Sequence, residues 1–192
     1  MDVIYLNGPS SAGKTSLARA LQSLLPGYYL HIGIDMLIEM MPEKANRWSA
    51  PEPCDGFTWQ AVRLPTGDLG MRVRAGPYGS QIAGAFHAVV ATLLSTGHRL
   101  IIDDVANGIS EVQIWLDELR HYAICTVGVV CALDELIKRE ATRGDRKTGS
   151  AAEQFYRVHT GVNYDLMVDT THYTATQCAN KIVEHIKHLS LV

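Results

Sequence analysis

The stretch Gly8-Pro9-Ser10-Ser11-Ala12-Gly13-Lys14-Thr15 matches the pattern GxxxxGK(S/T) in full. It follows a short β-branched run at 3–7 and opens into apolar residues at helical spacing. A glycine-rich loop between a strand and a helix can wrap backbone N–H groups around a triphosphate. The sequence therefore predicts a loop that binds ATP and extends to Ser16. In such a loop Lys14 reaches the β- and γ-phosphates, and Thr15 offers its hydroxyl to Mg²⁺.

Strands and helices alternate along the rest of the chain. Apolar and β-branched runs predict further strands at 28–34, 100–105, 123–131 and 166–168. Helical periodicity predicts helices at 36–41, 81–95, 110–120 (capped by Ser110), 133–142, 151–159 and 174–189. This alternation is typical of an α/β fold, a three-layer doubly wound sheet of five parallel strands. Ligands of such sheets bind beyond the carboxyl ends of the strands. We therefore expect the chemistry just after residues 7, 34, 104, 131 and 168.

The least regular part is residues 43–80, which together with Pro42 hold five of the seven prolines. Short strands are expected around 57–62. The segment is too short for a core of its own, so we interpret it as a substrate-side elaboration of a single domain, residues 1–192. Its aromatic side chains either line an apolar substrate pocket or form a small local core: Trp48, Phe57, Trp59 and Tyr78.

The strand that begins at Arg99 ends in two acids, Asp103 and Asp104. A carboxylate at this point lies beside the phosphate loop and can hold the shell of a Mg²⁺ ion. We assign Asp103 to the metal and expect Asp104 to contact substrate. The alternative is that these acids only form a turn or cap a helix.

Three arginines gather at 139–146: Arg139, Arg143 and Arg146. Arg139 and Arg143 share a helix face, and Gly144-Asp145 breaks the helix before Arg146. Because the group follows the fourth strand on the ligand side, we interpret residues 139–150 as a lid. Its arginines would stabilise charge on a transferring phosphoryl group. The alternative is a solvated surface.

Composition narrows the class of partner. The formal net charge is −3 and the pI about 6.2, which gives no basic face for a nucleic acid. The four cysteines lack the spacing of a zinc site or a disulfide framework. No apolar stretch approaches the roughly 20 residues of a membrane helix, and no signal peptide is evident. We expect a cytoplasmic protein; a homo-oligomer is compatible with the sequence.

With these features in place, the chain resembles the chloramphenicol phosphotransferases and their relatives. The resemblance lies in LNGPSSAGKTS (6–16), IGIDMLIEMMP (32–42), RLIIDDV (99–105), REATRGDR (139–146) and VHTGVNYDLMVDTT (158–171). It implies a P-loop fold of the adenylate and shikimate kinase type. It also implies that Asp35 is the catalytic base. A carboxylate after the second strand can orient a substrate hydroxyl, and the alternative is that Asp35 caps the helix at 36–41.

The resemblance implies an ATP-dependent kinase for a small-molecule hydroxyl, such as that of a chloramphenicol-like antibiotic. The runner-up is a kinase for a nucleoside, sugar or shikimate-like acceptor, and a third reading is a regulatory ATP-binding switch. A GTPase would carry an NKxD segment, but Asn180-Lys181 is followed by Ile182-Val183. Thr170 and Thr171, after the last strand, are expected to meet the base of ATP.

Overall fold

A computed structural model of the chain describes residues 1–49, 52–143 and 147–189. Its centre is a five-stranded parallel sheet in the order β2-β5-β1-β6-β7. The strands are β1 (Val3–Asn7), β2 (Tyr29–Gly33), β5 (Arg99–Asp104), β6 (Ile124–Val130) and β7 (Leu166–Asp169). This confirms the predicted doubly wound parallel sheet.

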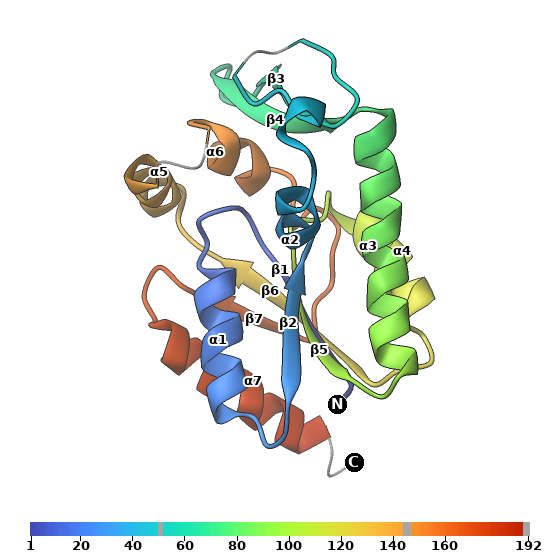
Figure 1. Ribbon diagram of the computed structural model, residues 1–192. Coiled ribbons are helices and arrows are strands. Elements are labelled where there is room, and N and C mark those ends of the chain that lie inside the picture. Colours follow the sequence, from blue (N-terminus) through green and yellow to red (C-terminus); the bar gives the residue numbers. More distant parts are fainter. Residues whose placement is uncertain (50–51, 144–146, 190–192) are drawn as a thin grey trace.

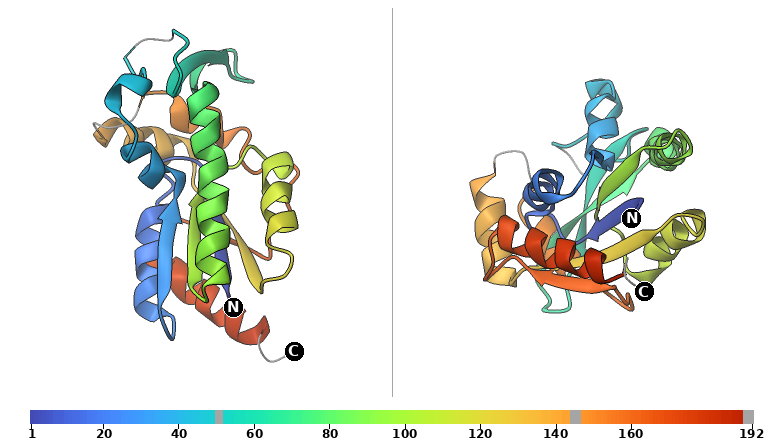
Figure 2. Two further views of the ribbon diagram at one scale, coloured as in Figure 1. Left: turned by 45° about the vertical axis from the view of Figure 1, so that its right-hand side comes forward. Right: turned by 90° about the horizontal axis from the view of Figure 1, so that it is seen from below.

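Helices cover both faces of the sheet (Figures 1 and 2). One face packs against α1 (Lys14–Leu24) and α7 (Ala175–Leu189), and the other against α3 (Pro77–Ser95) and α4 (Ile109–Glu118). Three short helices lie beyond the carboxyl ends of the strands, where ligands are expected (Figure 1): α2 (Ile34–Glu39), α5 (Leu133–Thr142) and α6 (Ser150–Phe155). No helix within the described ranges is long and apolar enough to cross a membrane.

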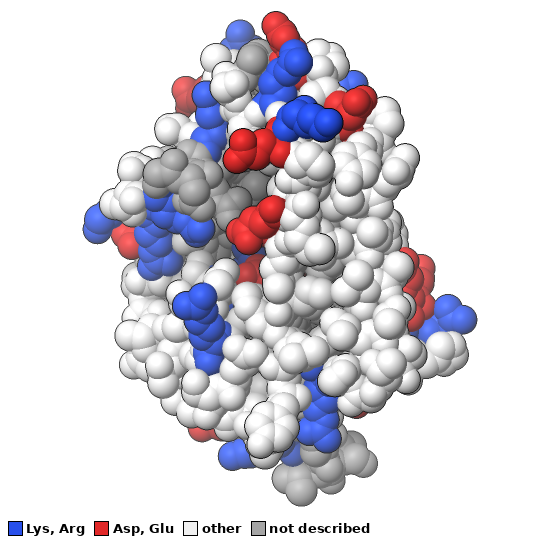
Figure 3. Space-filling view, in the orientation of Figure 1, with Lys and Arg blue, Asp and Glu red and all other residues white. Residues whose placement is uncertain are grey.

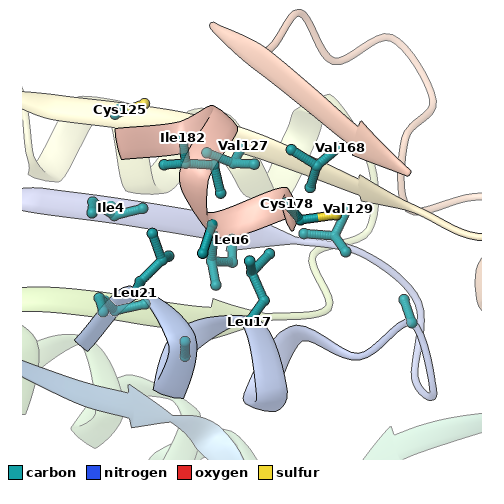
Figure 4. Packing of buried hydrophobic residues seen from close by; sticks show 14 of the residues in the cluster. Ile4, Leu6, Leu17, Leu21, Cys125, Val127, Val129, Val168, Cys178 and Ile182 are labelled. Atoms are coloured by element: carbon teal, nitrogen blue, oxygen red, sulfur yellow. The ribbon is translucent and has the colours of Figure 1, made fainter. Parts of the chain in front are cut away.

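Strand β1 lies at the centre of the core because its side chains alternate between the two faces. Ile4 and Leu6 pack with α1 and α7 (Figure 4), whereas Val3 and Tyr5 pack on the opposite face. All four are fully buried. Burial of an aliphatic side chain of this size contributes about 1.5–3 kcal/mol. This packing fixes the end of β1, from which the phosphate loop departs.

The segment between α2 and α3 forms a cap over the carboxyl edge of the sheet. It contains the short helix η1 (Glu43–Ala45) and an antiparallel hairpin of β3 (Phe57–Arg63) and β4 (Leu69–Ala75). Helix α3 begins at Pro77 and not at residue 81. The predicted start was late because Pro77 was counted with the irregular segment 43–80, whereas proline suits the first helical turn, where an N–H has no partner to lose.

Other boundaries also differ from the prediction. Helix α4 begins at Ile109 after Gly108, so Ser110 lies inside the helix and is not its cap. Gly108 has φ 66°, and a Cβ there would lie 2.8 Å from the carbonyl oxygen of Thr160. Helix α6 ends at Phe155, four residues before the predicted end. Helix α2 begins at Ile34, so Asp35 lies in its first turn and does not cap it.

Candidate active site

Two glycines fix the ends of the phosphate loop: Gly8 packs closely against β6, and Gly13 has a left-handed conformation. A Cβ on Gly8 would lie 2.4 Å from the carbonyl oxygen of Val129, so only glycine lets the loop leave the sheet here. Gly13 has φ 86° and precedes α1, with open space where a Cβ would be. Ser11 has φ 66°, the one positive value for a non-glycine residue in the described ranges. A strained residue in a loop of this kind is typical of a functional site.

Two polar side chains of the loop fit a bound phosphate. The hydroxyl of Ser11 is buried and has no hydrogen-bond partner in the part of the chain that the structure describes. Lys14 is also buried, and its Nζ donates to the carbonyl oxygen of Pro9 at 3.0 Å. An unpaired buried hydroxyl is costly unless a ligand compensates it, and a buried cation at its side favours an anionic ligand. The loop therefore has the chemistry of an anion site as well as its backbone shape.

Thr15 and Asp103 meet at the predicted metal position. Thr15 Oγ1 donates to Asp103 Oδ2 at 2.9 Å, and Lys14 Nζ lies 3.7 Å from Asp103 Oδ1. These oxygen donors suit Mg²⁺, which is commonly held by one or two protein oxygens together with phosphate oxygens and water. No group of three or more acidic, histidine or cysteine side chains that could hold a metal occurs among the described residues. The residues present fit a metal that is shared with the nucleotide.

Asp103 is kept ionised by its neighbours. Burial alone would raise its pKa, but the Lys14 ammonium, with His31 and Thr15, holds the pKa of this carboxyl below its usual value. His31 Nε2 lies 3.4 Å from Asp103 Oδ2. Sequence reasoning missed His31. His31 is the register partner of Ile101, which lies two residues before Asp103 on β5. Knowledge of the strand order would therefore have indicated His31.

The carboxylate of Asp104 is hydrogen bonded to other groups of the protein. Its Oδ2 accepts hydrogen bonds from Tyr5 Oη at 2.7 Å and from Trp115 Nε1 at 2.8 Å, and its Oδ1 accepts from the amide of Val105. Both oxygens thus accept hydrogen bonds from the protein, and the partners of Oδ2 belong to the core. The geometry favours a structural role, in contrast to the substrate contact that the sequence suggested.

Asp35 lies at the carboxyl edge of the sheet, two residues after the end of β2. Gly33, two residues earlier, is the register partner of Asp103 in the pairing of β2 with β5. Asp35 is exposed in the first turn of α2, a position at which a carboxylate also interacts favourably with the helix dipole. The structure thus brings the predicted base to the same edge as the predicted metal ligand.

The predicted lid arginines have different surroundings. Arg139 donates from Nη2 to the carbonyl oxygen of Thr170 at 2.8 Å and pairs with Glu135 at 2.9 Å. Arg143 is exposed at the end of α5. Arg146 lies outside the described residues. In Figure 3 basic side chains lie on the α5 side of a hollowed face and acidic ones on the α2 side.

The two threonines after β7 bind protein atoms through their hydroxyls. Thr170 Oγ1 donates to the carbonyl oxygen of Ala12 at 2.8 Å, which ties the phosphate loop to β7. Thr171 Oγ1 accepts from the amide of Ala132 at 2.8 Å. Contact of either residue with a base remains a prediction, and any such contact would have to be compatible with these bonds.

This geometry agrees with the comparisons to known proteins. The chloramphenicol phosphotransferase-like family matches residues 1–187. The chain belongs to this family. It is 32% identical over 186 residues to “Putative O-phosphotransferase Rv2636” of Mycobacterium tuberculosis, a match that covers 95% of this chain and 80% of that protein.

Two solved kinases share the fold of this family member. The Mycobacterium tuberculosis APS kinase CysC, in complex with AMPPNP and APS, has a TM-score of 0.64 and 14% identity, over 97% of both chains. A gluconokinase from Sinorhizobium meliloti 1021 has a TM-score of 0.57 and 13% identity, over 97% of this chain and 92% of that one. The family confirms the resemblance seen in the sequence and the predicted enzyme class, a phosphotransferase. The two kinases confirm the predicted fold.

Helices α5 and α6 place buried side chains beside the phosphate loop and the start of α6 that sequence reasoning missed. Gln154 is buried, and its Oε1 accepts a 2.5 Å hydrogen bond from the amide of Ser10. Glu140 of α5, 2% exposed, accepts from the amides of Gly149 and Ala151 and from the hydroxyl of Ser150. No motif marks these residues, because each acts on a partner that only the fold brings near.

The cap supplies a cavity and a small core. Trp48 packs against Phe57 and Trp59, with ring centroids 6.3 and 5.6 Å apart, and the latter two are buried. These aromatics therefore form a local core. Tyr78 instead lines a cavity of about 420 Å³, together with Pro42, Lys44, Ala45, Asp55, Pro77 and Gln81.

Proposed function

We propose that this protein transfers the γ-phosphoryl group of ATP to a hydroxyl of a small molecule. The observation that carries the proposal is the convergence of Lys14, Thr15 and Asp103 at the mouth of a complete phosphate loop, with Thr15 and Asp103 hydrogen bonded at 2.9 Å. The family supports transfer to a hydroxyl, since its 32% identical relative is named an O-phosphotransferase.

Each residue has a distinct role in this proposal. The loop amides and Lys14 bind the phosphates and keep them in one orientation. Thr15 and Asp103 would hold Mg²⁺, which supplies charge neutralisation of the phosphates when bound. Asp35 accepts the proton of the acceptor hydroxyl, and Arg143, with Arg139 and Arg146, meets negative charge on the transferring group.

For the acceptor we propose a hydroxylated small molecule, with an antibiotic of the chloramphenicol kind as the first candidate. The family description supports that candidate. The cavity lined by Tyr78, Pro42 and Pro77 offers apolar walls, and Lys44, Asp55 and Gln81 offer polar ends. Such a mixture is typical of small-molecule sites.

A coupled assay of ADP release tests the function. The purified protein is given ATP and Mg²⁺ with a panel of hydroxylated antibiotics, nucleosides and sugars, and Lys14→Ala serves as the inactive control. We expect ADP release that depends on an acceptor and disappears when the acceptor hydroxyl is replaced by hydrogen. ADP release at one rate with every compound and with none would instead indicate transfer to water, as in a regulatory switch.

A further inference from the structure

Helix α6 lies between the phosphate loop and the cap, and adjacent residues on it contact each. Gln154 accepts the hydrogen bond from the amide of Ser10 in the loop. Glu153 accepts from Arg72 Nε of β4 at 2.6 Å and from Arg157 at 2.8 Å. Gln154 is 8% exposed, and its contact with Ser10 is buried. Glu153 is 2% exposed, whereas the Arg72 side chain is 47% exposed, so their ion pair is buried on the Glu153 side only.

The hairpin is fastened to the same helix by its backbone. The amide of Met71 donates to the carbonyl oxygen of Gly149 at 3.1 Å, just before α6 begins. A Cβ on Gly70 would lie 3.1 Å from Cβ of Glu153, so the two elements pack with little space between them. A displacement of the hairpin therefore acts on α6 directly.

The amide that Gln154 binds precedes the strained residue of the loop. Ser11 has φ 66°, a sparsely populated region for a residue with a Cβ. Such a conformation persists only when its surroundings fix it. The hydrogen bond that the Ser10 amide donates to Gln154 fixes the peptide between Pro9 and Ser10, and so restricts the backbone next to Ser11.

We propose that Gln154 is a positioning residue for the phosphate loop and that the Arg72–Glu153 ion pair links the β3–β4 hairpin to it through α6. This inference rests on the proposed function, because it takes residues 8–15 as the nucleotide site. The hairpin is part of the cap on the acceptor side. A displacement of the hairpin is therefore transmitted to the phosphate loop through the contacts of Arg72 with Glu153 and of Gln154 with Ser10. Catalytic groups need support of this kind, since small displacements of reacting atoms cost rate.

The test measures affinity for a non-hydrolysable ATP analogue with Mg²⁺ by titration calorimetry, without any acceptor. Gln154→Met keeps the volume but removes the acceptor atom. We expect it to weaken binding roughly tenfold, the order that an unpaired buried donor costs. The loss should persist in a Ser11→Ala background, which keeps the Cβ. It should shrink in a Ser11→Gly background, where a positive φ carries no strain. An equal loss in both backgrounds, or none, overturns the role of Gln154.

A second pair of variants tests the link to the hairpin and does not depend on Gln154→Met folding. Arg72→Met should weaken analogue binding roughly twofold to tenfold, the range expected along a coupled network. The matched control is Arg74→Met, on the same strand, which should leave binding unchanged. Equal affinities for the two variants overturn the link. Lys14→Ala distinguishes a failure of the proposed function from a failure of this inference. If this variant binds the analogue as tightly as the wild type, the proposed function itself is wrong.

Discussion

Thr15 Oγ1 donates a 2.9 Å hydrogen bond to Oδ2 of Asp103, which joins the first turn of α1 to the carboxyl end of β5. We expect Thr15→Val to raise the Mg²⁺ concentration needed for half-maximal transfer by roughly tenfold or more, since the hydroxyl that we propose as a metal ligand is lost. Thr15→Ser keeps the hydroxyl and serves as the control. A magnesium titration of initial rates gives the answer, and identical curves for the three proteins would place the metal elsewhere.

Lys14→Ala should abolish phosphoryl transfer, with a loss of at least about a hundredfold, because it removes the charge that we propose to bind the phosphates. Among the described residues its Nζ donates a hydrogen bond to the carbonyl of Pro9 alone, and it lies 3.7 Å from Asp103 Oδ1. The fold should therefore survive, and the melting temperature should change by only a few degrees. Acceptor-dependent turnover and circular dichroism are measured on the same preparation. Full turnover in the variant would contradict the kinase assignment.

Arg143→Ala and Arg146→Ala should lower kcat more than they raise the KM for ATP. Positive groups of a lid meet negative charge mainly in the transition state, so their loss acts on the rate of transfer. Steady-state kinetics at varied ATP and saturating acceptor separate the two effects. A higher KM with unchanged kcat would assign these arginines to ground-state binding.

Asp35→Asn should leave ATP binding near the wild-type value and reduce transfer roughly a hundredfold to ten-thousandfold, the range for loss of a positioned base. Because Gly33 and not Asp35 is the N-cap of α2, the substitution does not remove a helix cap, and loss of the first-turn charge costs about 0.3–1 kcal/mol.

Single-turnover transfer and thermal melting together test the assignment of Asp35. A large drop in melting temperature with most of the kcat retained would give Asp35 a structural role. The base would then have to be another residue. Asp104 is a poor candidate, because both of its oxygens already accept hydrogen bonds.

His159 should make the stability of the fold depend on pH. Burial lowers the pKa of His159, and its Nδ1 lies 2.9 Å from the hydroxyl of Tyr164, whose own pKa burial raises to about 12. The folded pKa thus lies below the unfolded value of about 6.5. The stabilisation is present above that value and is lost as the pH falls through the folded pKa, because the unfolded chain binds the proton first.

We therefore expect the free energy of unfolding to fall between pH 7 and pH 5, and to fall less in His159→Gln. Urea unfolding at the two pH values measures the difference. Parallel pH profiles for wild type and variant would show that His159 is not the group responsible.

Much of this site can be predicted from residues close together in the sequence. The phosphate loop needs a strand, glycines, a lysine and a helix start in succession, and all of these lie within residues 3–25. Asp103 was found because it ends an apolar strand, and the carboxyl ends of parallel strands meet at one edge. Local hydrogen bonding and side-chain periodicity act over a few residues, so a linear pattern records them.

The tertiary structure alone decided which neighbouring residues share that edge and what they bind. Asp103 and Asp104 are equivalent in the sequence pattern, yet Asp103 meets Thr15 while Asp104 accepts from Tyr5 and Trp115. Successive strand residues point to opposite faces, and only the packing of α1 on one face and α4 on the other assigns each carboxylate its partners. Gln154 and Ser10 are 144 residues apart, and no local pattern relates them. Their contact exists because the cap, α6 and the phosphate loop close over the same end of the sheet.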